Sequence, residues 1–171
     1  MNLNFRRCTN LDLEVLVDIS RETFVAAFEE ANDPQDFKKY IGFAFNKEKV
    51  LSELENENSR FYFVFEKDEL VGYFKLNENE AQTDVKDEFS FELERIYVIG
   101  THQGKRIGAW ILQQVLELTK KEGKDYLWLG VWEKNTAAIR FYQKHGFKKF
   151  DTHPYYIGKD KQTDWLLRLD L

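Results

Sequence analysis

The sequence predicts an α/β protein of the α+β type, with a mixed, mostly antiparallel central sheet, flanking helices and one parallel β-α-β crossover. Two observations predict this class. Apolar residues recur at helical spacing within 11–54, and aromatic-rich runs with strand character follow within 60–99. Between 89 and 132 a strand, a helix and a second strand succeed one another, which requires a crossover between parallel strands. With 171 residues, 43% of them apolar, the chain has the size of one domain over residues 1–171.

The N-terminal half is predicted to hold one strand, three helices and a hairpin. The helical runs carry apolar residues on one face and begin near a polar residue or a proline. The hairpin joins two aromatic-rich runs through Lys67 and Asp68. The acidic stretch at 77–88 has no periodicity and predicts a solvated loop. The predicted elements are a strand at 3–8, helices at 11–28, from Pro34 and at 47–54, and hairpin strands at 60–66 and 69–76.

The C-terminal half is predicted to alternate strands and helices before a final hairpin. Ile107 opens the apolar stripe of a helix that Gly123 ends, and Asn135 caps a second helix that Gly146 ends. Alternating residues at 89–99 predict a long strand. The remaining predicted elements are a buried strand at 126–132 and an antiparallel pair at 147–158 and 163–171 around the turn GKDKQ.

The composition argues against several kinds of partner. The chain has 30 acidic and 25 basic residues and a net charge of -5, so no basic face for nucleic acid is expected. No apolar run is long enough for a membrane span, and the first residues lack an apolar signal segment, so we expect a soluble cytoplasmic protein. Cys8 has no partner for an internal disulfide, and the spacing of the three histidines predicts no metal site.

The stretch HQGKRIGAWIL, His102–Leu112, places two glycines and two cations directly before a helix. The first N–H groups of a helix are unpaired, and the helix dipole makes that end attractive to anions. Gly104 and Gly108 would let a phosphate approach the backbone, and Lys105 and Arg106 add positive charge. The turn matches neither the P-loop nor the dinucleotide-binding glycine pattern. An ordinary loop with two solvated cations is the alternative interpretation.

Together the segments LERIYV, HQGKRIG and WLGVWEKNTAAIRFYQKHGF resemble the GNAT superfamily of acyl-CoA-dependent N-acetyltransferases. Gln103–Gly108 match the family's Q/R-x-x-G-x-G/A pyrophosphate loop, and Asn135–Phe147 match its N-x-x-A-x-x-F-Y-x-x-x-G-F helix. Arg106 replaces the middle glycine of the loop, so we expect altered geometry with binding retained. The order of the N-terminal elements also matches. The ETFxxxF segment and the closing QTD look like the PaiA-type spermidine/spermine N-acetyltransferases.

The resemblance implies acetyl-CoA as the cofactor. The strand at Ile96–Val98 is implied to splay from its neighbour at 126–132 and to offer backbone N–H groups to the thioester carbonyl. Asn135 is implied to contact the pantetheine arm while it caps its helix, and Lys144 either reaches the phosphates or is simply solvated. The implied cofactor-binding residues are Ile96, Tyr97, Val98, Gln103, Gly104, Lys105, Arg106, Ile107, Gly108, Ala109, Asn135, Tyr142 and Lys144.

Acetyl transfer to a protonated amine needs a base and an acid. Glu92 and Glu94, two residues apart on a strand, point to one face, and by resemblance either position carries the base, with Glu94 nearer the acetyl group. Both side chains could instead be solvated. The FYxxxGF match nominates Tyr142 as the acid that protonates the departing thiolate, where an unassigned aromatic residue would more often be core.

The acceptor is predicted to be a small amine, with spermidine or spermine first. Acidic residues after the first helix and in the loop at 78–88 would attract a polycation, although solvation explains them equally well. Phe28, Glu29, Glu30 and Tyr97 are the predicted acceptor-binding residues. Acetylation of a protein or peptide amine and a non-catalytic acyl-CoA-binding regulatory module are the alternatives. The aromatic C-terminal hairpin could add to a neighbouring sheet, which leaves a homodimer open.

Overall fold

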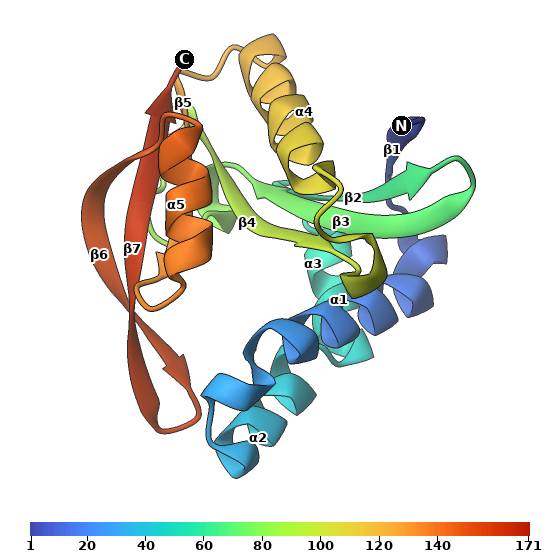
Figure 1. Cartoon of the computed structure of the whole chain (residues 1–171), viewed down its shortest axis with the longest axis vertical. Coiled ribbons are helices and arrows are strands. Elements are labelled where there is room, and N and C mark those ends of the chain that lie inside the picture. Colours follow the sequence, from blue (N-terminus) through green and yellow to red (C-terminus); the bar gives the residue numbers. More distant parts are fainter.

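The computed structural model describes all 171 residues, which form a seven-stranded sheet with helices on both faces (Figure 1). The strand order is β1-β2-β3-β4-β5-β7-β6, and every neighbouring pair is antiparallel except β4 and β5. The predicted fold class and element order are confirmed, including the parallel crossover through α4. The strands are β1 (Leu3–Arg7), β2 (Ser59–Glu66), β3 (Glu69–Asn77), β4 (Ser90–Val98), β5 (Tyr126–Trp132), β6 (Lys148–Ile157) and β7 (Asp160–Asp170).

Five α-helices connect and cover the strands. They are α1 (Leu13–Phe28), α2 (Pro34–Ala44), α3 (Lys47–Glu55), α4 (Ile107–Lys121) and α5 (Thr136–Lys144). Side chains of Asp33, Asn46 and Asn135 accept backbone N–H groups at the starts of α2, α3 and α5, which satisfies donors that a helix leaves unpaired. Gly123 and Gly146 end the preceding helices with positive φ values of 72° and 93°, as predicted. None of the helices has both the length and the apolar character that crossing a bilayer requires.

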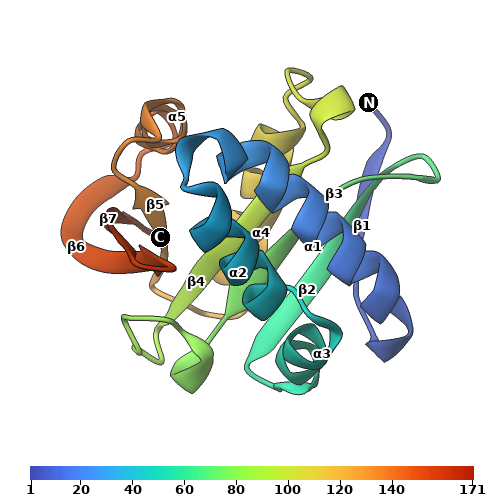
Figure 2. The same cartoon turned by 90° about the horizontal axis from the view of Figure 1, so that it is seen from below.

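The two faces of the sheet carry separate apolar clusters because side chains alternate along each strand. Phe61 and Tyr73 pack with α1 and α3 on one face, whereas Tyr62 and Phe74 pack with α4 and α5 on the other. In the view from below, α1, α2 and α3 lie together in front of the sheet and α4 lies behind it (Figure 2). The helices α1 and α2 also lead toward the β6–β7 hairpin, where a third apolar cluster joins them to Ile157.

Two boundaries differ from the predictions by two residues or more. The first helix begins at Leu13 because a 3₁₀ turn precedes it, with Thr9 and Asp12 forming a capping box. The predicted GKDKQ turn is wrong in length, since β7 already begins at Asp160 and pairs there with Ile157. Pro154 sits within β6, an edge strand, where a missing N–H donor is tolerated.

The β6–β7 hairpin is fastened to α2 and to the turn before it. The Tyr40 hydroxyl hydrogen-bonds the Tyr155 hydroxyl, and Gln162 Nε2 donates to Asn32 Oδ1 at 2.7 Å. Gly158 has φ +59°, and a Cβ placed there would lie 2.6 Å from Asp36, so glycine is required on both grounds. These contacts join α2 and the turn before it to the β6–β7 hairpin.

Candidate active site

The sheet opens between β4 and β5. These strands pair over only three positions, from Ser90–Glu92 to Tyr126–Trp128, after which β4 continues beside β3 and β5 beside β7. Backbone groups of β4 that face the gap therefore have no strand partner beyond Glu92. A cavity of about 320 Å³ lies at this opening. The divergence implied by the family resemblance is therefore present.

Several predicted site residues meet in this cavity. Those that line it are Phe28, Glu92, Glu94, Ile96, Tyr97, Asn135 and Tyr142. They come from α1, from β4, and from the N-cap and last turn of α5, three elements that share this one cavity. The two glutamates and the tyrosine therefore face the same space, as a base and an acid that act on one reaction would have to.

Glu92 is almost fully buried, and its carboxylate accepts three hydrogen bonds. Its Oε2 accepts the Thr83 backbone N–H at 2.9 Å and Asn77 Nδ2 at 3.0 Å, and its Oε1 accepts Thr83 Oγ1 at 2.5 Å. Burial raises the pKa of Glu92, the neighbouring Glu94 carboxylate raises it further, and the bonds from Thr83 and Asn77 only partly oppose this. A carboxyl group shifted toward neutrality is suited to exchange protons at physiological pH.

Glu94 lies two residues further along β4 in a different environment. Asn77 Nδ2 donates to its Oε2 at 2.8 Å, and the ammonium of the buried Lys75 forms an ion pair with the same oxygen. Burial acts to raise the pKa of Glu94, but Lys75 and Arg95 outweigh it and hold the pKa below its ordinary value. Glu94 therefore remains ionised under conditions in which Glu92 can bind a proton.

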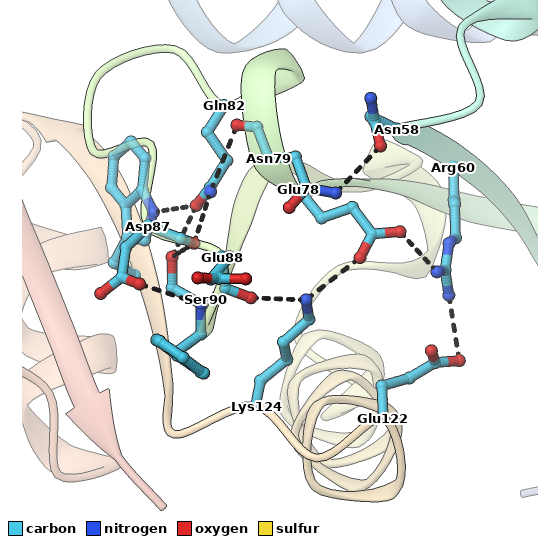
Figure 3. A network of polar contacts seen from close by, with 12 residues as sticks. Asn58, Arg60, Glu78, Asn79, Gln82, Asp87, Glu88, Ser90, Glu122 and Lys124 are labelled. Carbon is cyan, nitrogen blue, oxygen red and sulfur yellow. Dashed lines mark hydrogen bonds and ion pairs between the residues drawn. The ribbon is translucent and has the colours of Figure 1, made fainter.

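The loop between β3 and β4 is fixed to the sheet by a polar network (Figure 3). Gln82 is buried within it, and its Oε1 accepts the indole N–H of Trp128 at 2.7 Å and the hydroxyl of Ser90 at 2.8 Å. The predicted solvated loop is therefore wrong at this position, because the side chain of Gln82 packs into the site wall.

A second part of the network holds the beginning of the same loop. Glu78 forms ion pairs with Arg60 at 2.7 Å and with Lys124 at 3.2 Å, and Arg60 also pairs with Glu122 at 3.1 Å (Figure 3). Glu78 is thereby neutralised, so it does not belong to a free acidic rim. The network fixes the chain on both sides of Thr83, the residue that binds the Glu92 carboxylate.

Tyr142 reaches the cavity from α5 and is 8% exposed. Its ring packs against Phe141 and Phe147, with ring centroids 5.2 and 5.6 Å away. Burial alone raises the pKa of the Tyr142 phenol, which therefore keeps its proton at physiological pH. A neutral phenol that lines a cavity can donate a proton to an anion formed there.

Arg106 stands at the position immediately before α4 with φ 63° and ψ 15°, the left-handed conformation. Glycine adopts this conformation without penalty, whereas a residue with a Cβ is strained there. The glycine of the motif that the sequence resembles suits this conformation, and here Arg106 adopts it. Gly104, with φ 79°, makes the other left-handed turn of the loop.

The N–H groups from Gly104 to Ala109 donate to no backbone carbonyl, and the first return bond runs from Trp110 to Arg106 at 3.1 Å. A Cβ at Gly104 or Gly108 would meet no atom within 4 Å, so the approach to these amides is open. The loop that the sequence predicts to hold a diphosphate thus has unpaired N–H donors at the positive end of a helix. Lys105 and Arg106 are exposed and form no ion pair, and Gln103 Nε2 ties the loop to the Val98 carbonyl at 3.0 Å.

Aromatic side chains form the opposite wall. Phe24, Phe28, Tyr97 and Tyr155 line the cavity, whereas Tyr156 is 55% exposed and does not line it. Phe28 approaches Trp132 edge-on, with centroids 6.5 Å apart. The wall suits the methylene segments of an aliphatic amine, because such segments favour apolar surfaces.

Two further carboxylates, those of Asp84 and Asp164, also line the cavity, although neither is among the predicted site residues. Asp84 Oδ2 lies 3.2 Å from His153 Nδ1. Asp164, on β7, is register partner to His153 on β6. Burial raises the pKa of Asp164 to about 6, and His153 acts against that rise. The sequence singled out Asp164 only as the last residue of the closing QTD segment and gave it no role, because strand pairing alone brings β7 beside the site.

Some predicted binding residues lie elsewhere. Glu29 and Glu30 are exposed on a 3₁₀ turn after α1 and do not line the cavity, although Phe28 beside them does. Val98 lies at the end of β4, next to the glycine loop, and Lys144 is exposed at the end of α5. Asn135 combines both predicted properties, since its Oδ1 caps α5 by accepting Ala138 N–H at 3.2 Å and its side chain lines the cavity.

Comparison with known proteins gives a family match and several relatives. The model of the acetyltransferase (GNAT) family matches residues 13–147. An uncharacterized N-acetyltransferase of Lactobacillus delbrueckii subsp. lactis is 37% identical over 157 residues, covering 92% of this chain and 91% of the relative. A spermidine N(1)-acetyltransferase of Thermoplasma acidophilum is 28% identical over 158 residues, covering 89% of this chain and 92% of the relative.

A solved structure shares the fold over the whole chain. The crystal structure of the PaiA N-acetyltransferase of Thermoplasma acidophilum, in complex with coenzyme A, superposes with a TM-score of 0.79 at 24% identity and covers 100% of both chains. The likeness extends to the N-terminal strand β1 and the closing β6–β7 hairpin, which lie outside the residues that the family model matches.

Proposed function

Because this chain belongs to the GNAT family of acetyltransferases, we propose that it transfers the acetyl group of acetyl-CoA to a primary amine, with a polyamine such as spermidine as the acceptor. One observation carries the proposal. A carboxyl group of raised pKa and a protonated phenol line a single cavity, at a sheet opening beside a helix start with unpaired N–H groups.

The loop before α4 fits the diphosphate of coenzyme A. Open space over Gly104 and Gly108 admits a phosphate to the unpaired amides, and Lys105 and Arg106 have no competing carboxylate partner. Asn135, Tyr142 and the exposed strand edge at 96–98 lead from this loop into the cavity. When bound, acetyl-CoA supplies an acetyl group activated as a thioester.

Glu92 is the proposed base. An amine with a pKa near ~10.4 arrives protonated, so the base must remove a proton before the nitrogen can attack. Glu92 has the raised pKa that this step requires, while Lys75 holds Glu94 as a carboxylate. We assign Glu94, which is already paired with Lys75, the role of raising the pKa of Glu92 by its charge, and of the two positions that the resemblance allows for the base we choose Glu92.

The remaining groups act on the thioester end. Backbone N–H groups of β4 that face the gap are positioned to hydrogen-bond a carbonyl oxygen, and such donors stabilise developing negative charge. Tyr142 holds a proton on its phenol for the departing sulfur. Its burial keeps that proton in place until an anion forms beside it.

The acceptor assignment is supported by the charge and shape of the cavity. Asp84, Glu92, Glu94 and Asp164 line it together with several aromatic rings, a combination that suits a chain of methylenes between ammonium groups. Glu29 and Glu30, exposed beside Phe28, would add attraction at the rim. The Thermoplasma acidophilum relative is named a spermidine N(1)-acetyltransferase, which agrees with this choice.

The test measures thiol release from acetyl-CoA with spermidine, spermine, single amino acids and a lysine-containing peptide. We expect turnover with the polyamines, and Glu92→Gln should lower kcat by about 100-fold or more. Turnover with the peptide alone would favour a protein acetyltransferase. Binding of coenzyme A without turnover of any amine would overturn the proposal in favour of a regulatory module.

A further inference from the structure

Four carboxylates line the cavity, and three of them already have partners inside the chain. Thr83 and Asn77 bind Glu92, Lys75 pairs with Glu94, and His153 contacts Asp84. Asp164 is the exception, since its carboxylate forms no hydrogen bond or ion pair. Asp164 is half-buried, so its carboxylate has lost part of its contact with water and no group of the chain replaces it.

We infer that Asp164 binds the second ammonium group of the acceptor, so that the enzyme selects amines carrying at least two positive charges. This inference rests on the proposed function and adds to it a residue that determines specificity. In this arrangement Glu92 acts on the reacting amine and Asp164 binds the distal ammonium group.

The surroundings of Asp164 leave it accessible to a ligand. Its Oδ2 lies 3.5 Å from the position that a Cβ on Gly130 would occupy. Gly130 carries no side chain, and it is exposed at the cavity wall, so nothing on β5 covers the carboxylate there. A longer residue at this point of β5 would fill the space in front of Asp164.

The strand register gives the separation of the two ends. Glu92 is paired with Trp128, and Asp164 is paired with Trp132, four residues further along β5. The Asp164 carboxylate reaches back to Gly130, which lies two residues beyond Trp128. Two residues correspond to about 7 Å along a strand. An extended diaminopropane or diaminobutane unit has a comparable length, and these are the two units of spermidine. Trp132 and Phe28 line the same cavity and supply an apolar wall for the methylenes.

The experiment compares butylamine, 1,4-diaminobutane and spermidine as acceptors for the wild-type enzyme and for Asp164→Asn. Butylamine has the chain of diaminobutane but one charge. We expect Asp164→Asn to raise KM for diaminobutane and spermidine by roughly 10- to 100-fold, as expected for loss of a charged hydrogen bond. KM for butylamine should change less than about twofold, because no second charge is present to lose.

Two further variants separate a specific role from a structural one. Asp164→Glu keeps the charge and should retain the preference for diamines. Asp170→Asn removes a carboxylate from the same strand outside the cavity and should change no KM. Calorimetry with coenzyme A and thermal melting confirm that each variant is folded.

Equal loss with all three amines in Asp164→Asn, or equal KM values for butylamine and diaminobutane in the wild type, would overturn the inference. Those outcomes leave acetyl transfer itself intact. Failure of the proposed function has a different signature, namely no thiol release from the wild-type enzyme with any amine.

Discussion

Replacement of Arg106 by glycine should stabilise the protein and weaken coenzyme A binding at the same time. Arg106 has φ 63° before α4, and an L-residue in that conformation costs about 1 to 2 kcal/mol. Glycine removes this cost but adds conformational freedom to the unfolded chain, which offsets about 0.5 to 1 kcal/mol. The expected net gain for Arg106→Gly is therefore about 0.5 to 1 kcal/mol, or a rise in Tm of about 2 °C for a chain of this size.

The matched control is Arg106→Ala, which removes the guanidinium group but keeps a Cβ in the left-handed conformation. Urea unfolding of both variants isolates the backbone contribution, and calorimetry with coenzyme A isolates the charge. Both variants should bind coenzyme A several-fold more weakly, by about three- to tenfold, because each loses one cation at the phosphate-binding loop.

Two results would refute the reasoning about Arg106. If Arg106→Gly is no more stable than Arg106→Ala, the left-handed conformation is not the source of strain. If neither variant changes the affinity for coenzyme A and the affinity of the wild type is insensitive to salt, the guanidinium group does not contact phosphate.

Three further predictions concern the reaction centre. Because burial raises the pKa of Glu92, kcat should fall as the pH drops through that raised pKa. Glu92→Gln should remove this acidic limb from the pH profile of kcat. If the limb persists in the variant, it belongs to another group. In steady-state kinetics, Tyr142→Phe should lower kcat by about 10- to 100-fold and leave KM for acetyl-CoA within about twofold. An unchanged kcat would show that Tyr142 does not donate the proton. Asn77→Ala removes the amide that donates to both Glu92 and Glu94. We expect urea unfolding to show a free energy of unfolding about 2 kcal/mol lower, and the acidic limb of kcat to move to higher pH. A limb that moves to lower pH would contradict this role of Asn77.

The sequence predicts the elements well wherever one local signal dominates. The buried strand at Tyr126–Trp132 has the predicted bounds, because a continuous apolar run between polar residues leaves little choice. Gly146 ends α5 with a positive φ as predicted, since helix ends of this kind favour glycine. The strand order could also be anticipated in part, because one helix between two strands requires a parallel crossover.

The hydrogen bonds and other polar contacts of the site could not be predicted in the same way. Gln82 lies in an acidic stretch that locally resembles any solvated loop, yet it binds the indole of Trp128, 46 residues away in the sequence. Asp164 enters the site only because β7 inserts between β5 and β6. Such contacts depend on register across several strands, and no short window of sequence contains that information.

The roles of Glu92 and Glu94 show how one irregularity in the sheet decides chemistry. Strict alternation would place both carboxylates in equivalent positions on one face of β4. The register between β3 and β4 instead shifts at Lys75 and Leu76, so that Lys75 pairs with Arg95 and Leu76 with Leu93.

Glu94 is the unpaired residue of this bulge, and it meets the ammonium of Lys75 while Glu92 meets only neutral donors. A bulge redirects a side chain and is often found beside a functional site. Here it gives two adjacent glutamates opposite pKa shifts, so one is suited to carry a proton and the other to hold a charge. Lys75→Met should therefore raise the pKa of Glu94, and a pH profile with a second acidic limb would reveal the change, because both carboxylates would then compete for the same proton.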